Sequence, residues 1–254
     1  MTLLVLLACK TPPPAPTELS DLARFFFREH HAEEETTLGE GADNLVKLVG
    51  AVDPEADAID RAYTLSALLA DDVLGITRPD SDPEDCASLA VADRSPWPLS
   101  EHLAYMVLAD LAETSLTASV YDRSFDVDDP DCFLDRSCES MLTDNLIYRD
   151  TILLKVEYRL QKEYRWITSE TLGDAVIARG WIEEEAHGES GANHIYQNYE
   201  IDLYIPDGQE TLRFYGMWTD SDYAGLDEET AYNLSMNGTA SALKHLDEWI
   251  AEQQ

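Results

Sequence analysis

Closely spaced carboxylates near the middle of the chain are the first residues whose type and spacing could do chemistry. The segment from 126 to 135 is rich in aspartate, with side chains at Asp126, Asp128, Asp129, Asp131 and Asp135. Several carboxylate oxygens in a tight loop are the ligands that a hard cation such as Ca²⁺ prefers. We therefore consider Asp126, Asp128, Asp131 and Asp135 as candidate calcium ligands, with a solvated acidic linker as the alternative.

The spacing of these aspartates resembles the loop of an EF-hand only at its first two positions. Asp131 stands where that loop needs its glycine, and Ser137 stands where it needs its closing glutamate. The sequence indicates no other cofactor, so calcium is the one bound ion that we consider.

Two adjacent histidines offer a second set of metal-binding side chains. On a helix, His30 and His31 would form i, i+4 pairs with Glu34 and Glu35, a spacing that is compatible with metal ligands. The order of the residues differs from the HExxH pattern of zinc hydrolases. We favour a solvated helix end over a metal site for this segment.

No segment carries a recognisable catalytic pattern. Ser190 lies in a glycine-containing segment between His187 and His194, but the segment lacks the GxSxG pattern and is expected to be a hairpin loop. The sequence contains neither a glycine loop for phosphate or dinucleotides nor the residue order of a catalytic triad. We expect a non-enzymatic protein, with a hydrolase that lacks a local motif as an alternative.

The cysteines indicate disulfide bonding rather than a metal site. Cys132 and Cys138 enclose five residues, which is enough chain to close a disulfide. Cys86 could pair with either of them, because sequence alone does not fix connectivity. All three are disulfide candidates, and their spacing differs from the CxxC pairs of zinc sites.

The N-terminal segment resembles the signal of a membrane-anchored protein. An apolar run ends in Leu6-Leu7-Ala8-Cys9, and it is shorter than the roughly 20 residues that a membrane-spanning helix needs. These four residues resemble the lipobox of bacterial lipoproteins. The resemblance implies that residues 1–8 are a signal peptide, that Cys9 is lipidated and that residues 9–17 form a proline-rich tether. Lys10 after the cysteine then implies sorting to the outer membrane.

The charge balance limits the partners of the chain. Its 254 residues include 51 acidic and 17 basic side chains, which gives a net charge of -34. We therefore expect no nucleic-acid partner and no attraction to anionic lipid headgroups. Hydrophobic residues make up 44% of the chain, which is enough for the core of one large or two small domains.

Hydrophobic spacing predicts helices in the first half of the chain. Apolar residues recur at helical spacing from residue 17 onward and again between residues 65 and 73, where Gly75 would end the helix. Ser100 is placed to cap a third helix. Residues 76–97 are expected to form an acidic, proline-containing loop between the helices.

The period of the apolar residues changes to two from about residue 150, which is typical of strands. One apolar face is formed by Ile152, Leu154, Val156, Tyr158, Leu160, Tyr164 and Trp166. This strand is expected to bend near residues 161–163. A further strand is predicted at residues 175–182.

The most secure hairpin prediction follows that strand. Residues 195–205 and 212–218 alternate apolar and polar side chains, and Pro206-Asp207-Gly208 between them is a turn signal. Residues 232–236 predict a short additional strand. The chain then closes with a helix that is expected to begin near Thr239 or Ser241.

Together these elements predict an α+β fold. A helical region (18–125) and an acidic, cysteine-containing loop (126–138) precede an antiparallel meander of about four to five strands with a closing C-terminal helix (139–254). Residues 18–254 could form one domain. The strand series and the closing helix resemble the helix-grip fold of START-like lipid-binding domains, which implies an apolar cavity between sheet and helix. A core filled by aromatic side chains is the alternative that we favour.

These features define four hypotheses for function. The leading one is a lipoprotein of the bacterial cell envelope, anchored in the lipid bilayer of the outer membrane through Cys9, with a non-enzymatic binding or structural role. The second is a carrier of an apolar ligand, whose cavity would be lined by residues among Ile201, Leu203, Phe214 and Trp218. A calcium-binding envelope protein and a hydrolase are further alternatives.

Overall fold

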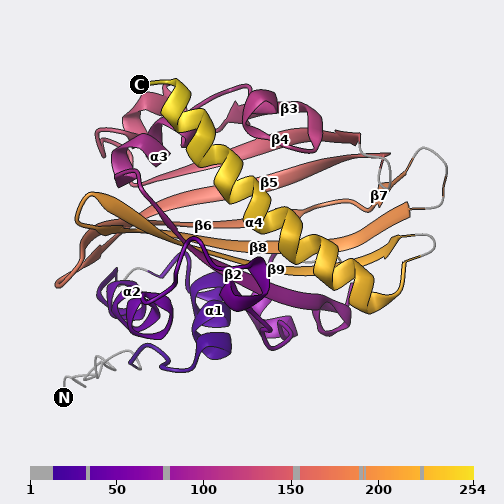
Figure 1. Cartoon of the computed structure of the whole chain (residues 1–254), viewed down its shortest axis with the longest axis horizontal. Coiled ribbons are helices and arrows are strands. Elements are labelled where there is room, and N and C mark those ends of the chain that lie inside the picture. The colour runs from indigo at the N-terminus through magenta and orange to yellow at the C-terminus, as the bar shows by residue number, and fades with distance from the viewer. Residues whose placement is uncertain are drawn as a thin grey trace, which may run out of the picture.

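The computed structural model describes residues 14–32, 35–76, 81–150, 155–188, 191, 193–223 and 226–254. An antiparallel sheet of nine strands is covered by helices on both faces (Figure 1). The strand order is β1-β2-β9-β8-β6-β5-β4-β3, and β7 pairs with β8 beside this path. Within the described residues, no helix is both long and apolar enough to cross a bilayer.

The helices are α1 (Leu19–Arg28), α2 (Glu35–Val49), α3 (Leu99–Met106) and α4 (Glu228–Glu252). The strands are β1 (Ala62–Tyr63), β2 (Ala87–Ser95), β3 (Ala118–Phe125), β4 (Ser140–Asp150), β5 (Lys155–Ser169), β6 (Gly173–Ile182), β7 (Ala186–His187), β8 (Asn193–Asp207) and β9 (Glu210–Tyr223). The order of N-terminal helices, antiparallel sheet and closing helix confirms the predicted α+β class.

The hairpin of β8 and β9 forms the centre of the sheet. Its pairing runs from Asn193 opposite Tyr223 to Asp207 opposite Glu210. Gly208 in the turn has a φ of 68°, a left-handed conformation that glycine adopts without steric cost. The predicted hairpin and its Pro-Asp-Gly turn are therefore confirmed.

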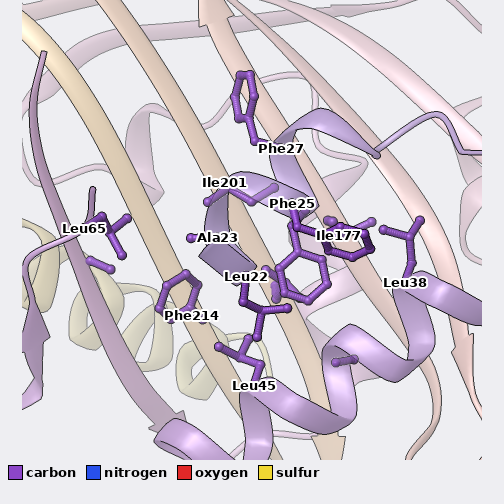
Figure 2. Close-up of a cluster of buried hydrophobic side chains, with 14 of the residues drawn as sticks. Leu22, Ala23, Phe25, Phe27, Leu38, Leu45, Leu65, Ile177, Ile201 and Phe214 are labelled. Carbon is purple, nitrogen blue, oxygen red and sulfur yellow. The ribbon is translucent and has the colours of Figure 1, made fainter. Parts of the chain in front are cut away.

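One face of the sheet packs against α1 and α2 in a large apolar core. Figure 2 shows Leu22 and Phe25 of α1 and Leu45 of α2 beside Ile177 and Phe214 of the sheet. These side chains are buried. The apolar residues that α1 places at helical spacing thus form the side of the helix that faces the sheet.

Close contact between α2 and the sheet depends on a glycine. A Cβ atom added at Gly39 would lie 2.2 Å from the carbonyl oxygen of Thr168 in β5. No side chain fits in that space, so α2 lies directly against the backbone of β5.

The opposite face is covered by α3 and by the long helix α4, which crosses the sheet obliquely (Figure 1). The carboxylate of Asp227 accepts a hydrogen bond from the backbone nitrogen of Thr230 at 2.8 Å and caps the start of α4. On β2, the side chains of Leu89 and Val91 pack with Ala240 of α4. The neighbouring alanines of β2 face the other way, into the core with α1 and α2.

The sheet is larger than predicted, and part of it comes from the half of the chain that was expected to be helical. β2 lies inside the predicted loop 76–97, and β3 (Ala118–Phe125) also falls in the predicted helical region 18–125. β2 is rich in small residues, which give a weak local strand signal. It pairs with β9 along its whole length, so this pairing, and not the local sequence propensity, makes the segment a strand.

Three helix predictions were also wrong in detail. Residues 65–73 contain only a 3-10 turn at Ala70–Val73. Ser100 is the second residue of α3 and not its cap. Residues 232–236 belong to α4, which begins well before Thr239.

Candidate functional site

The central strands send charged side chains to the face that α3 and α4 cover. On β8, Ile201 and Leu203 belong to the apolar core with α1 and α2, whereas Tyr204 packs with α3 on the other face. Side chains alternate along a strand, so Glu200 and Asp202 share the face of Tyr204. Both carboxylates are buried.

A buried lysine on β5 holds these two carboxylates together. The ammonium of Lys162 forms an ion pair with the Asp202 carboxylate and lies 3.3 Å from an oxygen of Glu200. The side chains of Lys162, Glu200 and Asp202 are 10%, 7% and 4% exposed. We call these three residues the charged cluster.

The charged cluster is electrostatically unbalanced. Burial raises the pKa of Asp202 to about 6, although the Lys162 ammonium opposes the rise. Burial acts in the same direction on Glu200, but Lys162 and a hydrogen bond from Asn198 outweigh it and bring the pKa of Glu200 below its usual value. Burial disfavours the charge on Lys162, yet Asp202 and Glu200 raise its pKa well above the usual range. Lys162 thus lies between two acidic groups, of which Asp202 is the more easily protonated.

Asp202 also carries an unmet hydrogen-bonding requirement. Its Oδ1 atom is buried and has no partner within the described part of the chain. Buried acceptors without partners are rare in folded proteins because they cost free energy. The charged cluster therefore costs stability, so a role in stabilising the fold does not explain its presence.

Tyrosines surround the charged cluster. The Lys162 ammonium lies 5.9 Å from the centre of the Tyr215 ring, within the range of a cation–π interaction. Burial raises the pKa of Tyr105 to about 12 and those of Tyr204 and Tyr215 well above their usual value. These phenols stay neutral at physiological pH and can act as hydrogen-bond donors.

A second buried cation lies on the side of the cluster toward α3. Arg123 of β3 donates hydrogen bonds to the Asn145 side chain at 2.8 Å, to the Tyr164 hydroxyl at 3.0 Å and to the carbonyl of Met106 at 2.5 Å. All of these partners are buried. Arg123 therefore fixes the end of α3 and the Tyr164 ring in place.

An arginine of the sheet helps to hold the helix α4 on this face. Arg213 of β9 donates two hydrogen bonds to the carboxylate of Asp247 in α4, at 2.8 and 2.9 Å. It also forms an ion pair with the buried Asp93 of β2. A bidentate arginine–carboxylate pair is directional, so it sets the position of α4 above the sheet.

The side chains of β9 that face α4 are less buried than those that face α1 and α2. Phe214 and Trp218, which point toward α1 and α2, are 1% and 0% exposed. Tyr215 and Met217 point toward α4 and are only half-buried. β9 is paired on both sides, so this exposure lies on the α4 face and not at a sheet edge.

The structure settles the disulfide pattern that the sequence left open. Cys132 and Cys138 are bonded to each other, with 5.3 Å between their Cα atoms. Cys86 is free and buried, and burial together with the charge of Asp220 raises the pKa of its thiol to about 12. Such a thiol is unreactive at neutral pH.

The predicted calcium ligands are found in a loop where the carboxylates bond to backbone nitrogens. Asp126 accepts a hydrogen bond from the nitrogen of Leu142 at 2.8 Å, and Asp135 accepts one from Ser137 at 3.0 Å. Calcium binding by Asp126, Asp128, Asp131 and Asp135 stays a prediction. The lipidation candidate Cys9 lies outside the described residues, as does Glu34.

The residues predicted to line a cavity are part of a packed core. Ile201, Leu203, Phe214 and Trp218 are packed in the core with α1 and α2, not beneath α4. The face that meets α4 carries the charged cluster instead. The sequence signal for it was Lys162, which interrupts the apolar series of β5 and was interpreted as a bend near residues 161–163. β5 continues through this position without interruption.

Comparisons with known proteins concern the fold alone. No protein-family model matches the chain, and no curated protein sequence matches it. The solved structures with a similar fold include a STAR-related lipid transfer protein from Xanthomonas axonopodis, with 10% identity and a TM-score of 0.48, covering 69% of this chain and 90% of that one.

Two human domains are similar to the same extent. The lipid transfer and protein localization domain of human StarD13 has 10% identity and a TM-score of 0.41, covering 65% of this chain and 77% of that one. Human StAR-related lipid transfer protein 5 has 9% identity and a TM-score of 0.42, covering 65% of this chain and 76% of that one. The function proposed below therefore rests on the residues of this chain.

Proposed function

We propose that this domain binds a small amphipathic molecule between the sheet and α4, as a carrier and not as an enzyme. The observation that carries the proposal is the charged cluster beneath α4, which combines buried charges with half-buried tyrosine and methionine side chains. A face built only for stability would be apolar and closed, as the core between the sheet and the helices α1 and α2 is.

The polar end of the ligand would meet Lys162. An ammonium has three donors, and within the described residues two carboxylates contact the Lys162 nitrogen. A third donor is available to an acceptor on the ligand, such as a carbonyl, hydroxyl or carboxylate oxygen. Tyr215 beside it adds an aromatic face.

The apolar part of the ligand would lie against α4. Met217 packs against the cluster that contains Ala240 of that helix, as do Tyr232 and Leu243. Methionine is flexible and polarisable and adapts to ligands of varied shape. The proposal therefore favours a ligand with one polar end and an aliphatic or aromatic body.

The test uses a dansyl-labelled fatty acid as the probe and the purified domain. Lys162→Met removes the donor, so we expect the Kd for the probe to rise at least about 10-fold, as for the loss of one charge-assisted hydrogen bond. Met217→Trp places a larger side chain between β9 and α4, at the position paired with Glu200, and we expect a similar loss. Circular dichroism reports whether each variant is folded.

The matched control is Lys155→Met on the same strand. Lys155 forms an exposed ion pair with Asp150, so its removal changes the net charge equally but not the proposed site. We expect wild-type affinity for the probe. Equal binding by the wild type, Lys162→Met and Met217→Trp would overturn the proposal, as would the absence of binding at millimolar protein.

We also propose that the domain is anchored to a bacterial membrane through Cys9, in the outer membrane of the cell envelope. The support is the sequence Leu6-Leu7-Ala8-Cys9. Native mass spectrometry of protein extracted from its own membranes tests this separately from ligand binding. A mass that fits cleavage before Cys9 plus acyl chains is expected, and an unmodified Cys9 with residues 1–8 retained would overturn it.

A further inference from the structure

The face of the sheet toward α1 and α2 carries a second group of polar side chains. They come from two segments that are far apart in the sequence. α1 ends at Arg28, so His30 and His31 lie in the turn after it and not on a helix as predicted. Glu163 projects from β5 toward this turn. Within the described residues, His30, His31 and Glu163 are the three metal-ligating side chains whose ligand atoms all lie within 4.8 Å of one another.

The distances within this group fit the edges of a tetrahedron around one metal ion. Nε2 of His31 lies 3.0 Å from Oε2 of Glu163, and Nδ1 of His30 lies 3.5 Å from the same oxygen. Zinc bonds of about 2.0–2.2 Å at tetrahedral angles place ligand atoms roughly 3.3–3.5 Å apart. The two distances to the Glu163 oxygen lie close to this range.

His30 is the observation that a structural interpretation leaves unexplained. Its side chain is 0% exposed, and neither ring nitrogen has a hydrogen-bond partner within the described residues. One explanation for a buried polar group without a partner is an ion that binds it.

The neighbours of the group fit the surroundings of a metal ligand. Arg179 donates a hydrogen bond to Glu163 at 3.2 Å, and Arg165 donates one to the backbone carbonyl of His30 at 2.7 Å. Ligating carboxylates in metal sites are hydrogen-bonded in this way, which fixes their orientation. Both guanidinium groups also repel a cation, so we expect micromolar rather than nanomolar affinity.

We propose that His30, His31 and Glu163 bind one divalent zinc-class ion. Two imidazole nitrogens and one carboxylate oxygen form the donor set of three-ligand zinc sites, which keep a fourth position for water. The His31 side chain is 62% exposed, so the ion can enter and the water can exchange. Binding would tie the turn after α1 to the middle of β5.

The experiment titrates the chelator-treated full chain with Zn²⁺ alone. The His194→Ala background is used throughout, because His187 and His194 form an exposed imidazole pair that could bind zinc independently. We expect one zinc ion per chain and a rise in Tm on binding, since a ligand of the native state stabilises it. Co²⁺ in place of Zn²⁺ should give the visible absorption of a tetrahedral site.

Two variants remove ligands without depending on His30, which is buried too deeply for a clean substitution. His31→Ala and Glu163→Gln are each expected to weaken zinc binding at least about 10-fold. His245→Ala is the control, because His245 is a partly exposed histidine 3.9 Å from Glu248 at a distant position. It should bind zinc as tightly as the background protein.

The outcomes separate a built site from adventitious binding. Unchanged affinity in both His31→Ala and Glu163→Gln, or affinity no tighter than millimolar in the background protein, would overturn the proposal. Loss of zinc binding in these variants with retention in His245→Ala would support it. The result does not depend on the amphipathic ligand, whose proposed site is on the other face of the sheet.

Discussion

The two faces of the sheet are built by the same strands but from different chemistry. Toward α1 and α2, the strands contribute Ile177, Ile201 and Phe214 to a closed apolar core (Figure 2). Toward α3 and α4, they contribute Lys162 and Asp202, with half-buried aromatic and methionine side chains nearby. The first face accounts for stability through burial of apolar area. The second contains buried charges that reduce stability, which is typical of a functional site.

The largest expected effect is a difference in stability between substitutions at two adjacent residues of β9, one on each face of the sheet. Trp218→Ala removes a fully buried ring that lies 5.9 Å from the Phe27 ring, so we expect the free energy of unfolding to fall by about 4 kcal/mol. Met217→Ala, on the α4 face, should cost about 1 kcal/mol because the residue is half-buried. Urea denaturation of both variants measures the difference. Equal losses would show that the two faces are packed alike.

The second prediction concerns the dependence of stability on pH. Asp202 has a pKa of about 6 in the folded chain against an ordinary value of 3.8, so the folded state favours its protonated form. The stabilisation that protonated Asp202 gives the folded state is fully present below about pH 3.8. It is lost as the pH rises through about 6, which lowers the free energy of unfolding by about 3 kcal/mol. Asp202→Asn cannot titrate. Its stability relative to wild type should therefore rise by that amount between pH 4 and pH 7.

An exposed carboxylate provides the comparison for this measurement. Asp174 of β6 is 44% exposed in its ion pair with Arg136. Asp174→Asn should follow the wild-type pH dependence between pH 4 and pH 7. If the stability of Asp202→Asn also changes with pH in parallel with wild type, the charged cluster does not raise the pKa of Asp202. The two faces would then not differ in this electrostatic property.

The third prediction tests the loop that closes one end of the α3 and α4 face. The disulfide between Cys132 and Cys138 holds Phe133, whose ring lies 5.5 Å from Trp166 and whose carbonyl accepts a hydrogen bond from that indole at 2.9 Å. Replacing both cysteines by serine should lower the free energy of unfolding by about 2 kcal/mol. Hydrogen exchange should speed up around Trp166 but not in α1. Reductant should have no further effect on the double variant.

Much of the apolar face could be predicted from the sequence, because its signals are local. The strict alternation of β8 and β9 and the Pro-Asp-Gly turn defined the hairpin. The small residues of β2 gave no such signal. The start of α4 was missed because residues 232–236 suggested a strand, although Asp227 caps the helix before them.

The charged face could not be predicted in the same way, because its contacts are long-range. Lys162 stood out only as a gap in an apolar series, and Glu200 and Asp202 were placed on the polar side of their strand. Which side of that strand is covered depends on the position of α4, and the predicted start of this helix was too late in the chain. On the other face, His30 and Glu163 are 133 residues apart, so no local pattern could bring them together either.

The smallest expected effect comes from removing one hydroxyl on each face. Tyr199→Phe, on the apolar face, loses a hydrogen bond to Gln197 at 3.3 Å and should cost about 1 kcal/mol. Tyr215→Phe should cost less, because that residue is half-buried and water can replace the bond. Its main effect should be electrostatic, since a hydrogen bond from Tyr215 helps to keep the pKa of Glu200 low. Infrared titration of the Glu200 carboxyl should therefore show a higher pKa in Tyr215→Phe and no change in Tyr199→Phe. A Glu200 pKa that moves equally in both variants would mean that the sheet transmits the change and that the two faces are not electrostatically separate.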